Sequence, residues 1–507
     1  MEDILADKKE NPYAYVVNKR DIYILICSVL LGMLFNLLFY KQPLGIGISY
    51  PIFVLAFYMV FLWNLRFKII FNISFGWFLS IPIIGLSATY FIFSNHIFAM
   101  LNFIIIPILI IAQTILITEE NNYKWYDASF IKDIFYGLVN RALGNISKPF
   151  VVGLQSLHIK KRNKKHAVIT KVLIGLTISI PLLIIIISLL ASADKIFKHF
   201  IDQISGLFGS ININDLSRQG FIILLIIVIA FSYTWSFSNS HDSIQPQVQS
   251  SEIDGNNQSW DPIITITILS VINCVYLVFI SIQFAYIFGA INNALPQDFT
   301  YAEYARRGFF ELLMVTLINF TLLLSSLRLT RKDGKLVARS TQLLHSLLVV
   351  CTMVILTSAY FRMSLYETAY GYTYLRVLTH SFMMLLGVLF VIAFYKIWNE
   401  RISLPKPYIV VSIMALMILN FANIDVLIAK NNIDRYLETG KLDTQYLRNL
   451  SYDTIPQLVN LLDDEKVSID IKKYLAEKHE VISKKQSWQS FNFSQHKAKQ
   501  VLSQYKF

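Results

Sequence analysis

Residues Ser270–Gly289 read SVINCVYLVFISIQFAYIFG, a run of uncharged and mostly apolar side chains. A helix needs about 20 such residues to cross the ~30 Å hydrocarbon layer of a bilayer. The whole chain of 507 residues has a similar character, because 55% of it is hydrophobic and only 15% is charged. Such a composition does not fold as one water-soluble globule around a single core. The sequence therefore predicts an integral membrane protein.

Eleven apolar segments predict membrane-spanning helices, since they are uniformly apolar and longer than the alternating segments of a membrane barrel. They cover residues 22–41, 48–65, 70–94, 97–118, 168–193, 219–237, 262–290, 307–327, 341–361, 374–397 and 406–422. The predicted fold is an all-α, polytopic transmembrane helical bundle with a small C-terminal helical extramembrane domain. Residues 1–21 are polar and the first apolar run lacks a small-residue cleavage site, so we expect a retained first helix and not a signal peptide.

The distribution of basic residues predicts an orientation. Most Lys and Arg residues of the loops fall on the side that holds the N-terminus, which the positive-inside rule makes cytoplasmic. An odd number of spans then places the C-terminus outside the cytoplasm. Loop 238–261 runs against this pattern, because it is predicted to be cytoplasmic and has no Lys or Arg. The net charge of +12 is accounted for by these loops, and their separation argues against nucleic acid as a partner.

Four regions follow from the hydropathy pattern. Residues 1–118 hold an N-terminal tail and four spans, 119–167 form a cytoplasmic amphipathic and basic segment, 168–424 form a seven-helix core, and 425–507 form a small helical, extracytoplasmic tail. Pro456 in that tail predicts a helix break or a first helical turn.

A basic run precedes the fifth span and is expected to lie against anionic lipid head groups. It consists of Lys160, Lys161, Arg162, Lys164 and Lys165. Topology anchoring is the favoured interpretation of this run, with specific lipid regulation as the alternative. Three scattered cysteines with no paired spacing predict neither a disulfide framework nor a metal site, and we expect no cofactor.

Two polar stretches border predicted spans on the outer side: residues 299–312, FTYAEYARRGFFEL, and residues 361–376, FRMSLYETAYGYTYLR. Arginine forks and tyrosine rings suit a carboxylate, a phosphate or a sugar. The candidate ligand-binding or structural residues are Tyr301, Glu303, Tyr304, Arg306, Arg307, Glu311, Arg362, Tyr366, Glu367, Tyr370 and Arg376. The alternative is that these charges pair with one another and join helices, an interpretation that the sequence slightly favours.

These stretches, together with SVINCVYLVFISIQFAYIFG, closely resemble the signature of a family of bacterial polytopic membrane proteins. The family is the domain-of-unknown-function family 4173, related to family 4153, and TYAEYARRGFFEL is the most specific part of the resemblance. The similarity is strongest over residues 270–376 and extends more loosely into the tail. It implies a multi-pass protein of the bacterial cytoplasmic membrane, and it supplies no catalytic residues.

Three functions fit the sequence. The first is a transporter or permease for a small anionic or zwitterionic solute, bound at the outer Arg/Tyr/Glu site. The second is a membrane enzyme that acts on a lipid-linked or envelope substrate, through a carboxylate acid or base. The third is an envelope sensor or scaffold that binds a protein partner or a lipid head group, with residues 425–507 as the protein-binding part. Familiar catalytic motifs are missing from the sequence, which favours a protein that is not an enzyme.

Overall fold

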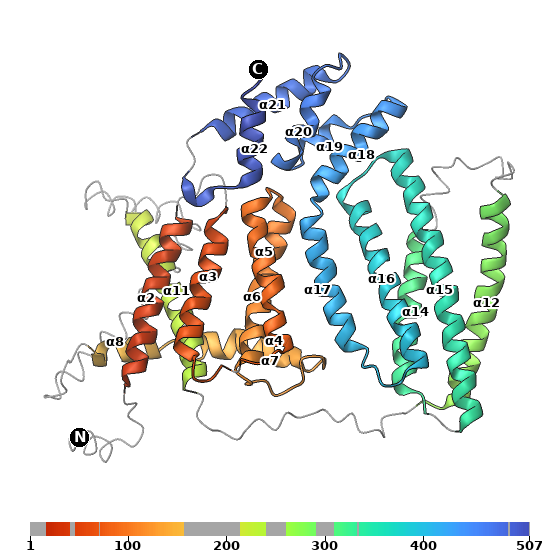
Figure 1. The fold of residues 1–507 in the computed structure, drawn as a ribbon, viewed down its shortest axis with the longest axis horizontal. Coiled ribbons are helices and arrows are strands. Elements are labelled where there is room, and N and C mark those ends of the chain that lie inside the picture. The colour runs from red at the N-terminus through yellow and green to blue at the C-terminus, as the bar shows by residue number, and fades with distance from the viewer. Residues whose placement is uncertain are drawn as a thin grey trace, which may run out of the picture.

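The computed structural model describes residues 17–40, 46–69, 71–156, 213–239, 260–289, 309–331, 334–484 and 487–505. Within these ranges the regular structure is helical, and the single β interaction is an isolated bridge between Trp260 and Thr330. Figure 1 shows long, roughly parallel helices with a cluster of shorter helices at one end. The all-α membrane-protein class predicted from the sequence is therefore confirmed.

Eight helical stretches in the described part of the chain are long and apolar enough to cross a membrane. They are Lys19–Phe39 (α2), Phe75–Ile92 (α4, Phe75–Phe78, with α5, Ser80–Ile92), His96–Ile117 (α6), Gln219–Ser238 of α11 (Ile213–Ser238), Pro262–Ile282 of α12 (Pro262–Gly289), Phe309–Leu329 (α14), Lys335–Tyr370 (α15) and Tyr374–Trp398 (α16). A ninth is α17 (Pro405–Phe421) taken with α18 (Ile424–Thr439), which is bent by 59°. Helix α3 (Ser49–Leu65) is apolar but shorter. Each of these helices overlaps a predicted span, and the predicted span 168–193 lies outside the described residues.

Polar side chains inside these helices bond to their own backbone, which suits them to a bilayer. Ser28 donates to the carbonyl of Ile24 and Thr316 to that of Leu312, both at 2.8 Å. Hydrocarbon supplies no hydrogen-bond partner, so a hydroxyl within a span must find one in the protein. Apolar side chains such as Met59, 70% exposed, point outward, as expected for surfaces that face lipid.

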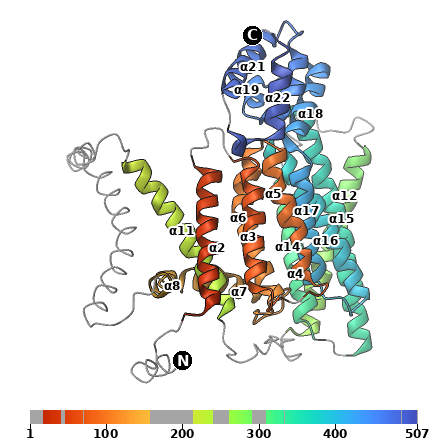
Figure 2. The same cartoon turned by 60° about the vertical axis from the view of Figure 1, so that its left-hand side comes forward.

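The long helices form two groups. Helices α2, α3, α5, α6 and α11 pack with one another in the first, and α12, α14, α15 and α16 in the second (Figure 1). Helix α17 lies between them and contacts both α5 and α16. Within the first group α2 and α11 lie side by side (Figure 2), and they pack tightly at Gly32, where an added Cβ would meet Ile227 at 2.5 Å.

Short helices lie across the end of the bundle at which α2 begins (Figure 1). They are α7 (Phe130–Tyr136), the π-helical turn η1 (Gly137–Arg141) and α8 (Lys148–Ser156). The amphipathic pattern of this segment thus forms helices. Phe130 is buried against the bundle, while Ile131 and Phe135 are exposed.

The C-terminal helices gather at the opposite end of the bundle (Figure 1). They are α18, α19 (Thr444–Arg448), α20 (Ile455–Leu458), α21 (Ser468–Ser483) and α22 (Phe493–Leu502), with 3-10 turns between them. Their common core also includes Phe98 of α6 and Val377 of α16, so the cluster is built onto the membrane helices. Pro456 lies in the first turn of α20, where its missing N–H is not needed.

Polar contacts add to this C-terminal core. The Tyr436 hydroxyl donates to Asp464 at 2.7 Å, and this hydrogen bond holds the pKa of the Asp464 carboxyl below its usual value. Burial lowers the pKa of Lys478, whose ammonium group lies 4.7 Å from the centre of the Tyr452 ring. Tyr452 thus offers the partly desolvated charge of Lys478 a cation–π contact.

We expect the C-terminal cluster to depend on α21. Replacing Ile471, which is 0% exposed, by alanine should cost about 2–5 kcal/mol of stability, because it leaves a cavity in the core. Ile469→Ala is the matched control on the same helix, since Ile469 is 80% exposed. Limited proteolysis and thermal unfolding of purified protein measure the effect. Equal behaviour of the two variants would contradict the assigned core.

Candidate functional site

Residues proposed from the sequence as one polar cluster are only partly described. Tyr301, Glu303, Tyr304, Arg306 and Arg307 lie outside the described residues, as does the basic run 160–165. The other six are on α14, α15 and α16, at the end of the bundle that carries the C-terminal helices (Figure 1). Glu311 is exposed in the first turn of α14, whereas Arg362 of α15 is buried.

Glu367 of this cluster forms a buried pair with a histidine. Its Oε2 lies 3.0 Å from Nδ1 of His380, on the next helix, and the glutamate is 3% exposed. The other imidazole nitrogen lies 3.2 Å from the carbonyl oxygen of Tyr360, whose ring lies against the imidazole with centres 4.2 Å apart. His380 was not among the residues proposed from the sequence, because it lies inside the apolar run of α16, nine residues after Gly371.

Arg376 and the tyrosines support the turn between α15 and α16. The Arg376 guanidinium donates to the carbonyl of Gly371 and lies 4.3 Å from the centre of the Tyr366 ring. Tyr366 in turn packs against Tyr370, with ring centres 4.9 Å apart. Gly371 has φ +86°, which favours glycine. The described contacts of Arg376 are therefore those of a residue that joins helices.

The C-terminal helices hold the same turn in place. Asn432 of α18 accepts a hydrogen bond from the Tyr372 N–H and donates one to the Tyr372 carbonyl, both at 2.8 Å. Arg435 donates to the carbonyls of Thr368 and Ala369 at the end of α15. These carbonyls have no partner within the helix, so Arg435 satisfies acceptors that would otherwise be free. Asn432 and Arg435 were not predicted from the sequence as contacts of this turn, because they lie in the C-terminal tail.

A cavity of about 460 Å³, whose lining mixes amide and hydroxyl side chains with a larger apolar surface, lies at this end of the first helix group. It lies between the C-terminal ends of α5 and α17 and the N-terminal ends of α6 and α22. Its polar lining includes Thr89, Ser94, Asn95, Asn420, Asn492 and Gln495. Apolar residues such as Phe98 and Phe103 complete the walls. The cavity was not predicted from the sequence, because the lining residues of α17 and α22 are more than 300 residues from those of α5 and α6 in the chain.

Hydrogen bonds fix most of this lining. Asn492 donates to the carbonyls of Tyr90 and Phe93 at 2.9 and 2.7 Å, which attaches α22 to the end of α5. Below the cavity Asn102 of α6 donates to Asn420 Oδ1 of α17 at 2.7 Å, and to Thr89 at 3.1 Å. These hydrogen bonds fix the side-chain amides of Asn102, Asn420 and Asn492 in or next to the cavity.

Two buried acceptors at this cavity are not satisfied. Within the described residues, Oε1 of Gln495 and Oδ1 of Asn102 have no hydrogen-bond partner. Gln495 is 9% exposed and lines the cavity, while Asn102 is 0% exposed directly below it. Buried polar atoms are nearly always paired, and these two acceptors have almost no accessible surface, so a donor in the cavity would reach them only after a side chain turned.

Carboxylates adjoin the same region from the C-terminal helices. Asp425 of α18 accepts hydrogen bonds from Asn95 at 2.8 Å and from the Tyr374 hydroxyl, and Asp453 accepts one from the Ser94 N–H at 2.8 Å. Ser94 and Asn95, which donate to these carboxylates, directly precede the first residue of α6. These two carboxylates therefore position the cavity wall formed by Ser94 and Asn95.

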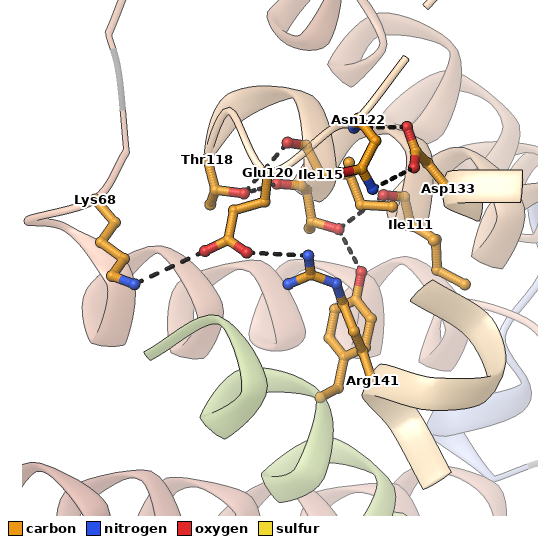
Figure 3. Close-up of polar contacts among 10 residues, drawn as sticks. Lys68, Ile111, Ile115, Thr118, Glu120, Asn122, Asp133 and Arg141 are labelled. Carbon is orange, nitrogen blue, oxygen red and sulfur yellow. Dashed lines mark hydrogen bonds and ion pairs between the residues drawn. The ribbon is translucent and has the colours of Figure 1, made fainter. Parts of the chain in front are cut away.

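A charged cluster lies at the other end of the bundle (Figure 3). Glu120, just after α6, accepts a hydrogen bond from Arg141 of η1 at 3.0 Å and lies 3.7 Å from the ammonium of Lys68. Arg141 is 8% exposed, and its guanidinium lies 4.1 Å from the centre of the Phe237 ring. The carboxylate of Asp133 accepts hydrogen bonds from both the N–H and the side-chain amide of Asn122 (Figure 3). These contacts hold the 119–141 segment to the ends of α3, α6 and α11.

We expect Glu120→Gln to destabilise the protein by roughly 3 kcal/mol, because it leaves the charge of buried Arg141 without its carboxylate. Glu119→Gln is the matched control, since the neighbouring Glu119 is exposed. Thermal unfolding in detergent should show a clearly lower midpoint for Glu120→Gln alone. The same midpoint for wild type and both variants would show that the pair contributes no stability.

Comparison with known proteins places the chain in a family. Residues 80–461, well over half of the chain, match the family described as "Domain of unknown function (DUF4153)". No curated protein and no solved structure matches the chain. The match agrees with the predicted relationship to family 4153, while the assignment to family 4173 and its signature stay predictions. In the described part of the chain, no group of three or more His, Cys, Asp or Glu side chains is arranged to hold a metal ion. The chain is a multi-pass helical membrane protein that belongs to the family of the domain of unknown function DUF4153.

Proposed function

We propose that the protein transports a small anionic or zwitterionic solute, and that the cavity beside α22 is the site where this solute binds. The observation that carries the proposal is the set of side-chain amides in the lining of that cavity, Asn95, Asn420 and Gln495 among them. The buried Oε1 of Gln495 has no partner among the described residues, and a solute with an ammonium or hydroxyl group would donate to it once the side chain turned toward the cavity. The volume of the cavity, about 460 Å³, falls within the ~300–1,000 Å³ of ordinary small-molecule sites.

The chemistry of the lining supports a polar solute. Side-chain amides both donate and accept hydrogen bonds, so the amides of Asn95, Asn420 and Gln495 suit a solute that carries groups of both kinds. His96 lines the same cavity and adds a group that can donate to a carboxylate or phosphate oxygen. A zwitterion satisfies both requirements in one molecule.

The position of the cavity supports transport over simple binding. It lies above the Asn102–Asn420 hydrogen bond, which joins α6 to α17. Pro107 removes one backbone hydrogen bond from α6 below this point, and proline-interrupted helices recur at transport sites. Because α17 contacts both helix groups, a shift of one group against the other would stretch or break that hydrogen bond.

The predicted orientation places this cavity on the extracytoplasmic side of the cytoplasmic membrane, at the end that the C-terminal helices cover. The Arg/Tyr/Glu cluster lies at the same end of the bundle. We assign its described members Glu367, Arg376 and Tyr366 to holding α15 and α16 together.

A solute panel tests the proposal. Purified protein is screened by thermal shift against amino acids, dicarboxylates and sugar phosphates, and compounds that stabilise it are followed for uptake into proteoliposomes. We expect at least one compound to stabilise the wild type and to be taken up. Gln495→Leu should weaken its binding about tenfold, since the bound solute loses a hydrogen bond of about 1.5 kcal/mol.

Gln500→Leu is the matched control, because Gln500 is exposed on the same helix. Gln495→Leu should fold normally, since it replaces an acceptor that has no partner by an apolar group. Binding that is equally strong in Gln495→Leu would remove the cavity from the proposal. Uptake of no compound, despite binding, would refute transport.

A further inference from the structure

A second and larger cavity of about 710 Å³ opens at the other end of the bundle. It lies where α6, the 124–134 segment, the start of α17 and the end of α14 come together. Ile108 and Leu109 of α6 form one wall, and Ile409 and Ile413 of α17 form the facing wall. The cavity is therefore mostly apolar in its depth.

Aromatic and basic side chains surround the open part of this second cavity. Trp125 stacks on Phe75 with ring centres 3.8 Å apart, and the ammonium of Lys406 lies 4.6 Å from the centre of the Tyr126 ring. Tryptophan and tyrosine are typical of the boundary between hydrocarbon and head groups. These rings therefore mark the depth at which a lipid head group would lie.

Two further cations line the same cavity and are exposed. They are Lys124, from the segment after α6, and Arg328, from the last turn of α14. The acidic residue in the lining is Asp127, whose Oδ1 accepts a hydrogen bond from the Ser129 N–H at 3.0 Å. The rim therefore carries an excess of positive charge above apolar walls.

We infer that this cavity binds one anionic phospholipid from the membrane. Lys124 and Arg328 bind the phosphate, and the isoleucine and leucine walls hold the first part of an acyl chain. A free phosphate would use the two cations and leave the apolar walls exposed, so the combination of both surfaces specifies a lipid. The inference does not rest on the proposed transport, because it concerns a different cavity and requires only binding.

The two cations come from different helix groups, which gives the lipid a structural consequence. Lys124 belongs to the segment that follows α6 in the first group, and Arg328 belongs to α14 in the second. One phosphate between them would contact both cations, reduce their repulsion and link the groups at the end opposite the C-terminal helices. A bound lipid therefore stabilises the folded protein by mass action.

The experiment uses the full chain in nanodiscs of phosphatidylcholine, with and without phosphatidylglycerol. Native mass spectrometry counts the lipids that remain bound, and thermal unfolding reports stability. We expect the wild type to retain phosphatidylglycerol over phosphatidylcholine and to unfold at a higher temperature when it is present. Lys124→Gln/Arg328→Gln should lower this preference at least tenfold.

Lys335→Gln/Arg339→Gln is the matched control, because it removes one exposed lysine and one exposed arginine from the start of α15, away from the cavity. Soluble glycerol 1-phosphate, added in excess, should not displace the lipid. Retention of both lipids alike, or equal loss of preference in the two double variants, would overturn the inference. Displacement by glycerol 1-phosphate would show a phosphate site that does not use the apolar walls, and would equally overturn it.

Discussion

Hydrocarbon offers the protein backbone no hydrogen-bond partner, and the rest of this structure depends on that constraint. Each span must satisfy its peptide groups within its own helix, and polar side chains in a span must bond to the backbone or to a neighbouring helix. Ser28 and Thr316 take the first course, and Asn102 with Asn420 takes the second. Charged groups consequently collect at the two ends of the bundle. The chemistry available to the protein is therefore concentrated there.

The two ends differ in the chemistry they offer. At the end covered by the C-terminal helices, carboxylates accept hydrogen bonds from the wall of a cavity that combines neutral amides with apolar side chains. At the other end the rim of the larger cavity is basic and aromatic, above walls of isoleucine and leucine. The first arrangement suits a water-soluble molecule that both donates and accepts hydrogen bonds. The second suits a molecule that is itself part of the membrane.

Hydropathy predicted the helices well, because a uniformly apolar segment of sufficient length has few other stable forms in a bilayer. It predicted residues 70–94 as one span, and α4 and α5 together form one such stretch, Phe75–Ile92, which is interrupted only between Phe78 and Ser80. The partners of side chains were harder to predict, because pairing depends on how each helix is rotated. Glu367 was singled out, but its partner His380 was not, and Gln495 lay in a tail that was interpreted separately from the membrane helices.

The junction of α17 and α18 connects the cavity beside α22 to the whole fold. The chain bends there by 59°, and Asn423 at the bend has φ +46° and donates a hydrogen bond to Asp453 at 3.2 Å. A left-handed asparagine needs such support, since the conformation is unfavourable for residues other than glycine. Asp453 also accepts from Ser94, so one carboxylate ties the bend to the start of α6. A molecule bound between Asn420 and Gln495 would contact both sides of this junction, and would therefore couple the arrangement of the membrane helices to that of the C-terminal cluster.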